Sequence, residues 1–232
     1  MDIQLLFILL LFIVAFLYAA VGHGGASGYL ALMALFSMAP SFMKPTALLL
    51  NLFVSLSAFF LFYRGGHFRW KLFLPFALAS VPLSFLGGMI ALDADVYKKI
   101  LGALLLIPVF RMLFFRNADE HELKKGTNGL SLLIGAVIGF LSGLIGIGGG
   151  IILSPVLLML KWTNQKQTAA ISALFIFVNS LAGLGGQLSK GMVVESEMFI
   201  FAGIAFVGGS LGGWLGASRF NQQILKYLLA VV

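Results

Sequence analysis

The chain has 232 residues, of which 60% are apolar and only 10% are charged, and its mean hydropathy is +1.05. A soluble domain carries roughly 25% charged residues, so this composition excludes a water-soluble domain and indicates an integral membrane protein. The sequence has no cysteine, which excludes disulfides, thiolate catalysis and thiolate metal sites.

The net charge of +7 and the pI of about 9.8 have two interpretations. In a soluble protein they would suggest nucleic acid as a partner. Here the basic residues lie in short loops between apolar segments, which is the pattern that sets membrane topology. We therefore expect the lipid bilayer, and no nucleic acid, as a partner.

The first element, residues 4–21, is apolar and is preceded by the acidic Asp2 rather than by basic residues. A cleavable signal peptide has positive charge at that place, so the sequence predicts a retained transmembrane helix. The apolar stretch continues to residue 39 with one break at Gly22–Gly25. As a single helix it would be about 54 Å long, against about 30 Å of bilayer core. A second element at 26–39 therefore crosses back or re-enters.

Eight further helices are predicted along the chain, at 45–63, 72–91, 97–115, 129–145, 150–160, 167–187, 198–217 and 221–232. Elements 26–39 and 150–160 are too short for a comfortable full crossing and can be re-entrant. The predicted fold class is an all-α integral membrane protein with 8–10 membrane helices.

Two copies of one pattern divide the chain. A shift of 124 residues places Gly22, Gly24 and Gly25 on Gly146, Gly148 and Gly149. We predict a first membrane repeat at 1–115, a linker at 116–128 and a second membrane repeat at 129–232. Duplicated halves are common among secondary transporters.

The basic residues predict the orientation of the two repeats. With five elements in each repeat, eleven Lys and Arg fall on one side of the membrane and four on the other; with four elements the split is eight to seven. The positive-inside rule therefore favours five elements. Because five is odd, the repeats are inverted, the N-terminus lies outside and the linker is cytoplasmic. The four outer residues are Lys44, Lys98, Lys99 and Lys190.

The two glycine-rich breaks are candidates for substrate binding. A break just before a helix N-terminus leaves backbone N–H groups free at the positive end of the helix dipole, which suits an anion without any basic side chain. Within a membrane such groups are tolerated only where they are buried in protein or line a cavity. The candidate residues are Gly22, Gly24, Gly25, Gly146, Gly148, Gly149 and Gly150.

Two alternatives apply to these glycines. Small residues at every fourth position let helices pack closely, which is the favoured interpretation for Gly135, Gly139 and Gly143 and for Gly208, Gly212 and Gly216. The glycines of the two breaks are clustered instead. A dinucleotide loop is disfavoured because the third glycine of GxGxxG and the preceding strand are missing.

Polar side chains complete the candidate site, which adds His23, Ser27, Asn51, Ser55, Ser172 and Asn179. Intramembrane polar groups either bond between helices or face a pathway. His23 can bind an anion when protonated, take part in proton coupling, or be satisfied by a backbone carbonyl. No Asp or Glu falls within a predicted helix, which favours an anionic substrate.

Catalytic and metal-binding patterns are missing from the sequence. The histidines are isolated, and neither HExxH nor a pair of carboxylates occurs within a predicted helix. We therefore expect no enzyme activity, no metal site and no cofactor.

Two segments of the second half, "GFLSGLIGIGGGIILSPVLLML" and "QTAAISALFIFVNSLAGLGG", closely resemble the signature of the TauE/SafE family, also described as sulfite exporters. In the first half, "AAVGHGGASGYLALMAL" and "KPTALLLNLFVS" resemble its counterpart, so the resemblance covers nearly the whole chain. It implies a multi-pass carrier of the bacterial or archaeal inner (plasma) membrane for small anions such as sulfite, sulfoacetate or thiosulfate, and it suggests export. The first break departs from the pattern, because it reads GHGGASG and lacks an equivalent of Pro155, so the substrate can differ from sulfite.

The sequence thus predicts a secondary transporter of small anions, sulfite or an organosulfonate, that works by alternating access. The substrate would lie between the two glycine breaks. A passive anion channel and a non-transporting membrane subunit are the alternatives, and a homodimer is compatible with each.

Overall fold

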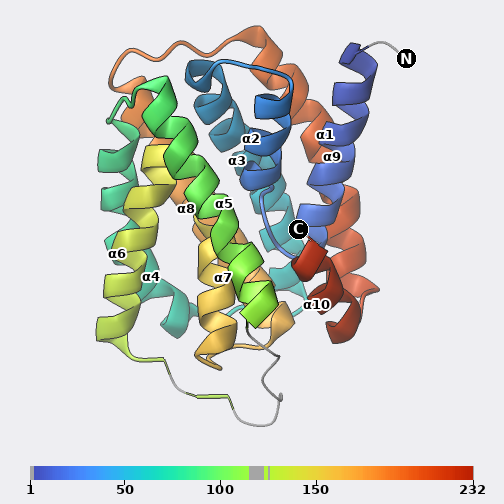
Figure 1. Ribbon diagram of the computed structural model, residues 1–232. Coiled ribbons are helices and arrows are strands. Elements are labelled where there is room, and N and C mark those ends of the chain that lie inside the picture. Colours follow the sequence, from blue (N-terminus) through green and yellow to red (C-terminus); the bar gives the residue numbers. More distant parts are fainter. Residues whose placement is uncertain (1–2, 115–122, 125, 232) are drawn as a thin grey trace.

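The computed structural model describes residues 3–114, 123–124 and 126–231, and these form ten helices and no strand (Figure 1). The helices are α1 (Ile3–Ala20), α2 (Ala26–Leu35), α3 (Pro40–Arg64), α4 (Trp70–Gly88), α5 (Ala94–Phe114), α6 (Asn128–Ile145), α7 (Gly150–Met159), α8 (Gln165–Leu188), α9 (Ser196–Ser218) and α10 (Gln222–Val231). The prediction of an all-α membrane protein is confirmed. Most of the predicted linker 116–128 lies outside the described residues.

Six of these helices are long and apolar enough to cross a bilayer, within the part of the chain that the structure describes: α1, α3, α4, α6, α8 and α9. The helices α2 and α7 have 10 residues each, as short as the sequence suggested. The predicted count of eight to ten membrane helices also included α5 and α10, which are not among these six. Helix α10 has only 10 residues. Helix α5 carries four charged residues, Asp95, Lys98, Lys99 and Arg111.

Helix boundaries shift by up to five residues from the prediction, and two shifts have a clear cause. The third helix begins at Pro40 rather than at residue 45, because a proline in the first turn gives up no intrahelical hydrogen bond. Helix α8 begins at Gln165 rather than at 167, because Asn164 and Gln167 form a capping box. In that box the Gln167 amide donates to Asn164 Oδ1 at 2.9 Å.

The bundle has two distinct ends. In Figure 1, α1 begins at the upper end and α6 begins at the lower end, so the two helices run in opposite directions. We call the upper end the N-terminal end, where Pro40, Met89 and Met192 lie together. We call the lower end the linker end, where the Lys124 amide donates to the Lys161 carbonyl at 2.8 Å.

Helix packing follows the same scheme in both halves of the chain. Helix α1 packs on α9 as α6 packs on α4; α3 packs on α9 as α8 packs on α4; and α2 packs on α3 as α7 packs on α8. Helices α3 and α8 contact each other at the centre. If the second half repeats the first, α1, α2 and α3 correspond to α6, α7 and α8, while α9 and α4 exchange places as their partners. This exchange, and the opposite directions of α1 and α6, are what an inverted repeat requires.

Glycine stripes bring two of these helix pairs close together. Gly135, Gly139 and Gly143 of α6 lie against the carbonyl oxygens of Phe76, Ser80 and Ser84 on α4. Gly208, Gly212 and Gly216 of α9 lie against those of Phe12, Phe16 and Ala20 on α1. A methyl group at any of these glycines would collide with the facing backbone, so the packing role predicted for both stripes is confirmed.

Candidate functional site

The two glycine breaks have matching backbone conformations. Gly22 and Gly25 have φ of +78° and +94°, and Gly146 and Gly149, their equivalents at a shift of 124, have +90° and +80°. Only glycine adopts this left-handed region without strain, which explains why an apolar segment is interrupted by glycines here. In both breaks the second of these glycines is the N-cap of a short helix, α2 or α7.

The structure brings the two breaks together at the centre of the bundle. A methyl group added at Gly24 would collide with the Asn51 side chain and lie 2.8 Å from Ile176 Cγ2. A methyl group added at Gly148 would meet the same two side chains, Asn51 Nδ2 at 2.5 Å and Ile176 Cγ2 at 2.8 Å. The breaks therefore lie on either side of Asn51 from α3 and Ile176 from α8.

Several backbone N–H groups of the breaks have no acceptor among the described residues. Among the described residues, the amides of Gly24, Gly25, Gly148, Gly149 and Gly150 donate to no carbonyl or side chain, although all five residues are buried. Buried N–H groups are nearly always hydrogen-bonded in folded proteins. These amides, at the N-termini of α2 and α7, therefore have free capacity for a ligand or water that accepts hydrogen bonds.

His23 joins the first break to the second. Its Nε2 lies 3.1 Å from the Gly150 carbonyl oxygen and 3.0 Å from Ser154 Oγ, and its Nδ1 lies 3.2 Å from the Val21 carbonyl oxygen. A carbonyl oxygen only accepts, so a neutral ring satisfies one of the two carbonyls and an imidazolium satisfies both. The ring is thus held by backbone carbonyls, the third of the roles that the sequence left open.

The predicted polar residues fall into two groups. Asn51 lies between the breaks, and Ser172 reaches His23 through Ser154, whose hydroxyl lies 2.7 Å from Ser172 Oγ. The others bond away from the breaks. Ser27 donates to the Tyr18 hydroxyl, Ser55 donates to a carbonyl of its own helix, and Asn179 Nδ2 donates to the Phe175 carbonyl.

The glycines at the margins of the breaks contact surrounding helices instead of each other. Gly22 packs against Ala169 of α8, and Gly146 lies beside Lys44 of α3. Gly25 is covered by the Tyr29 ring and Gly149 by Phe175. These four glycines shape the breaks, whereas Gly24 and Gly148 face the shared centre.

Sequence reasoning missed two serines of this centre. Ser154 bridges His23 and Ser172, and Ser180 accepts a hydrogen bond from Asn51 Nδ2 at 3.1 Å. Ser154 follows the second break by four residues, one helical turn, and that spacing was a usable signal. Ser180 could not be chosen over its neighbour Asn179 without knowing which face of α8 meets α3.

The chemistry of the centre suits an acceptor-rich ligand. Its free groups are mainly N–H donors at two helix N-termini, where the helix dipoles favour negative charge. The described residues contain no group of three His, Cys, Asp or Glu side chains that could hold a metal ion. An oxyanion matches such a donor set.

Comparisons with known proteins point in one direction. Residues 7–232 match the family described as Sulfite exporter TauE/SafE. The chain is 37% identical over 227 residues to a probable membrane transporter protein of Sinorhizobium fredii, which covers 95% of this chain and 91% of that protein. A probable membrane transporter protein of Methanocaldococcus jannaschii is 30% identical over 136 residues, covering 57% and 49%. The probable membrane transporter protein YunE of Bacillus subtilis is 25% identical over 207 residues, covering 81% and 74%. No solved structure matches the chain.

Proposed function

Because the chain belongs to the sulfite exporter TauE/SafE family of membrane transporters, we propose that it is a secondary transporter of a small oxyanion. The substrate is sulfite or an organosulfonate, and it binds between the two glycine breaks. Backbone N–H groups of Gly24 and Gly148 and the Asn51 side chain contact it there. No cofactor and no catalytic step are needed.

One observation carries this proposal: five buried glycine amides at two facing helix N-termini have no acceptor among the described residues. Asn51 lies at the same place, where its Oδ1, an unpaired acceptor, can only accept a hydrogen bond from a water or from a protonated oxygen of the ligand. A buried N–H donor without an acceptor destabilises the fold unless a ligand or water accepts its hydrogen bond. An oxyanion accepts several such bonds at once.

We propose alternating access as the mechanism, with the inverted repeats exchanging their arrangements around the fixed site. By the positive-inside rule, the excess of Lys and Arg at the linker end supports a cytoplasmic position for that end in a bacterial or archaeal inner membrane. The N-terminal end is then external, and transport runs outward. A homodimer is compatible with this scheme.

The test is uptake of radiolabelled sulfite and methanesulfonate into proteoliposomes, with Gly148→Ala compared with Gly66→Ala. Both glycines have positive φ, +71° and +74°, so both substitutions strain the backbone. Only the methyl group at position 148 meets Asn51, because position 66 has nothing within 4 Å. We expect saturable flux with counterflow, lost in Gly148→Ala and retained in Gly66→Ala.

Other outcomes identify the competing functions. Flux that does not saturate and shows no counterflow would indicate a passive anion channel. Wild-type protein that is folded but moves no anion would indicate a non-transporting subunit. Equal flux in both variants would remove the glycine break from the binding site.

A further inference from the structure

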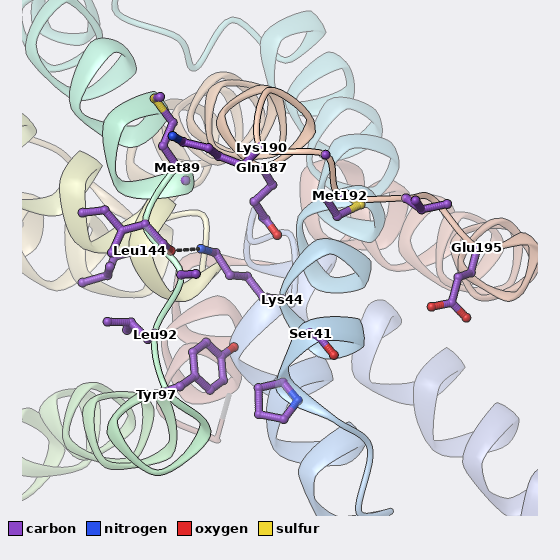
Figure 2. A pocket seen from close by; sticks show the side chains of 16 residues that line it. Ser41, Lys44, Met89, Leu92, Tyr97, Leu144, Gln187, Lys190, Met192 and Glu195 are labelled. Atoms are coloured by element: carbon purple, nitrogen blue, oxygen red, sulfur yellow. Dashed lines mark hydrogen bonds between the residues drawn. The ribbon is translucent and has the colours of Figure 1, made fainter.

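A cavity of about 480 Å³ lies at the N-terminal end of the bundle, away from the contact between the two breaks (Figure 2). It is bounded by the start of α3, the segment after α4, the start of α5, the end of α6 and the segment after α8. Its volume is in the range of small-molecule sites. None of the residues predicted as site residues lines it.

Lys44 is the buried charged group of this cavity, which the exposed Lys190 and Glu195 also line. Its side chain is only 8% exposed, and its one hydrogen-bond partner among the described residues is the Ile90 carbonyl, 3.3 Å from Nζ. Glu195, the one carboxylate among the lining residues, is exposed at the margin, and Figure 2 shows it far from the Lys44 ammonium. A buried ammonium without a counter-charge is unfavourable, so the cavity has a deficit of negative charge.

Gln187 supplies a second donor. Its side chain is 8% exposed, and its Nε2 has no hydrogen-bond partner. Figure 2 shows Gln187 from α8 and Lys44 from α3 extending into the same space. A cation and an amide from two helices therefore line one cavity, with the Gln187 amide oxygen drawn toward it in Figure 2. A half rotation of that amide brings the unpaired Nε2 to the same place, where it and Lys44 can donate to a single oxyanion.

The cavity also leads toward the second glycine break. Leu144, two residues before Gly146, is part of its wall. A methyl group added at Gly146 would lie 3.0 Å from Lys44 Cγ. Tyr97, another wall residue, donates its hydroxyl to the Ile145 carbonyl at 2.8 Å and so satisfies an end carbonyl of α6.

We propose that this cavity is a second anion site, in which Lys44 Nζ neutralises an oxyanion and Gln187 Nε2 donates to it. The apolar walls at Met89, Leu92 and Met192 leave room for a short hydrocarbon group on the anion. Binding here requires only the cavity. Its role as the access site on the path to the glycine breaks rests on the proposed transport function.

Binding of sodium methanesulfonate to the purified full chain in detergent tests the site, measured by calorimetry at constant ionic strength. Loss of a charge-assisted hydrogen bond predicts about 10- to 100-fold weaker binding for Lys44→Gln. Lys44→Arg keeps the charge and should bind within about threefold of wild type. Lys98→Gln removes an exposed charge of α5 that does not line the cavity, so it should bind like wild type.

Gln187→Leu provides a second variant, should Lys44→Gln fail to fold, and should bind about 3- to 10-fold more weakly because one neutral donor is lost. Wild-type affinity in folded Lys44→Gln would overturn the site, as would wild-type protein that binds no methanesulfonate. A melting temperature that falls while affinity stays constant would make Lys44 a structural partner of the Ile90 carbonyl.

Flux separates this site from the proposed function. Anion binding that depends on Lys44, with no flux in wild-type proteoliposomes, would keep the site and reject the transporter. Flux that depends on Gly148 but not on Lys44 would keep the transporter and reject the site.

Discussion

Each end of the bundle holds a lysine that donates a hydrogen bond to a backbone carbonyl of another segment, but the packing around the two lysines differs. At the N-terminal end, Lys44 of α3 donates to the Ile90 carbonyl just beyond α4, at 3.3 Å. At the linker end, Lys166 of α8 donates to the Ala217 carbonyl near the end of α9, also at 3.3 Å. Helix α3 corresponds to α8 and α4 to α9 in the packing scheme, so the two hydrogen bonds are alike. The lysines themselves are not equivalent in register, because a shift of 124 places Lys44 on Thr168.

The threonines that follow these lysines make similar hydrogen bonds. Thr46 donates to the Phe42 carbonyl at 2.6 Å, and Thr168 donates to the Asn164 carbonyl at 2.8 Å. Each lies two residues after its lysine and bonds one turn back along its own helix. The helix starts themselves differ, because α3 begins at Pro40 without a side-chain cap and α8 begins after the Asn164 capping box.

Packing around the lysines is different. Lys44 faces a cavity of about 480 Å³ that reaches Leu144. At the linker end, Gly22 lies against Ala169, and Phe62, Ala169 and Ala170 form a buried cluster. Burial, together with the charge of Lys166, lowers the pKa of His67 at this end.

Among the described residues, a cavity thus lies beside Lys44 at one end and a small buried apolar cluster lies near Lys166 at the other. A transporter with two related halves gains alternating access when the halves exchange these arrangements. In that scheme the described structure is open toward the N-terminal end.

Cysteine accessibility tests most directly whether the two ends of the bundle differ. Leu144 and Ala20 are equivalents at a shift of 124, and they are 8% and 0% exposed. Only Leu144 lines the cavity, so we expect Leu144→Cys to react with a maleimide about 100-fold faster than Ala20→Cys, which reacts only after local opening. The rates would be measured in proteoliposomes, and wild type gives no background because the chain has no cysteine.

Ser41→Cys serves as the positive control, because Ser41 is exposed and lines the same cavity. Equal rates at positions 144 and 20 would show that the two ends are equally open, and the distinction between them would be lost.

The effect of each lysine substitution should depend on the side of the membrane from which the anion is added. We expect Lys44→Gln to raise the half-saturating anion concentration about tenfold when the anion is added at the N-terminal end. Lys166→Gln should do so only when the anion is added at the linker end, because its ammonium lies there. Flux into oriented proteoliposomes measures both, and identical effects from the two sides would contradict the assignment of one lysine to each end.

The loss of stability on substituting one glycine in each stripe tests whether the two helix pairs pack equally closely. Gly139→Ala would push α6 away from the Ser80 backbone, and Gly212→Ala would push α9 away from the Phe16 backbone. Overpacking of this kind costs about 1–3 kcal/mol, so both variants should lower the unfolding midpoint by similar amounts. Gly203→Ala is the matched control: it is exposed on α9 with nothing within 4 Å, and should raise stability by up to about 1 kcal/mol.

The sequence predicted the helices, the breaks and the packing glycines because each leaves a local mark: hydropathy, clustering or a spacing of four. It did not predict which polar residues meet, since that depends on the rotation of α3 and α8 about their axes. Asn179 and Ser55 were chosen for helical spacing, yet each bonds within its own helix. Lys44 was assigned to topology because its burial depends on α4, α5 and α8, which no local pattern reveals.

The central hydrogen bond between Asn51 Nδ2 and Ser180 Oγ gives the smallest expected effect. It joins α3 to α8 midway between the two ends, at 3.1 Å and fully buried. Ser180→Ala leaves the Asn51 amide without its acceptor, which costs about 1–2 kcal/mol and lowers the melting temperature by a few degrees. Ser57→Ala is the control, because Ser57 donates only to the Val54 carbonyl of its own helix.

A double-mutant cycle with Asn51→Ala and Ser180→Ala should give a coupling of about 1 kcal/mol. Zero coupling would mean that the two halves meet at the glycine breaks without help from this bond.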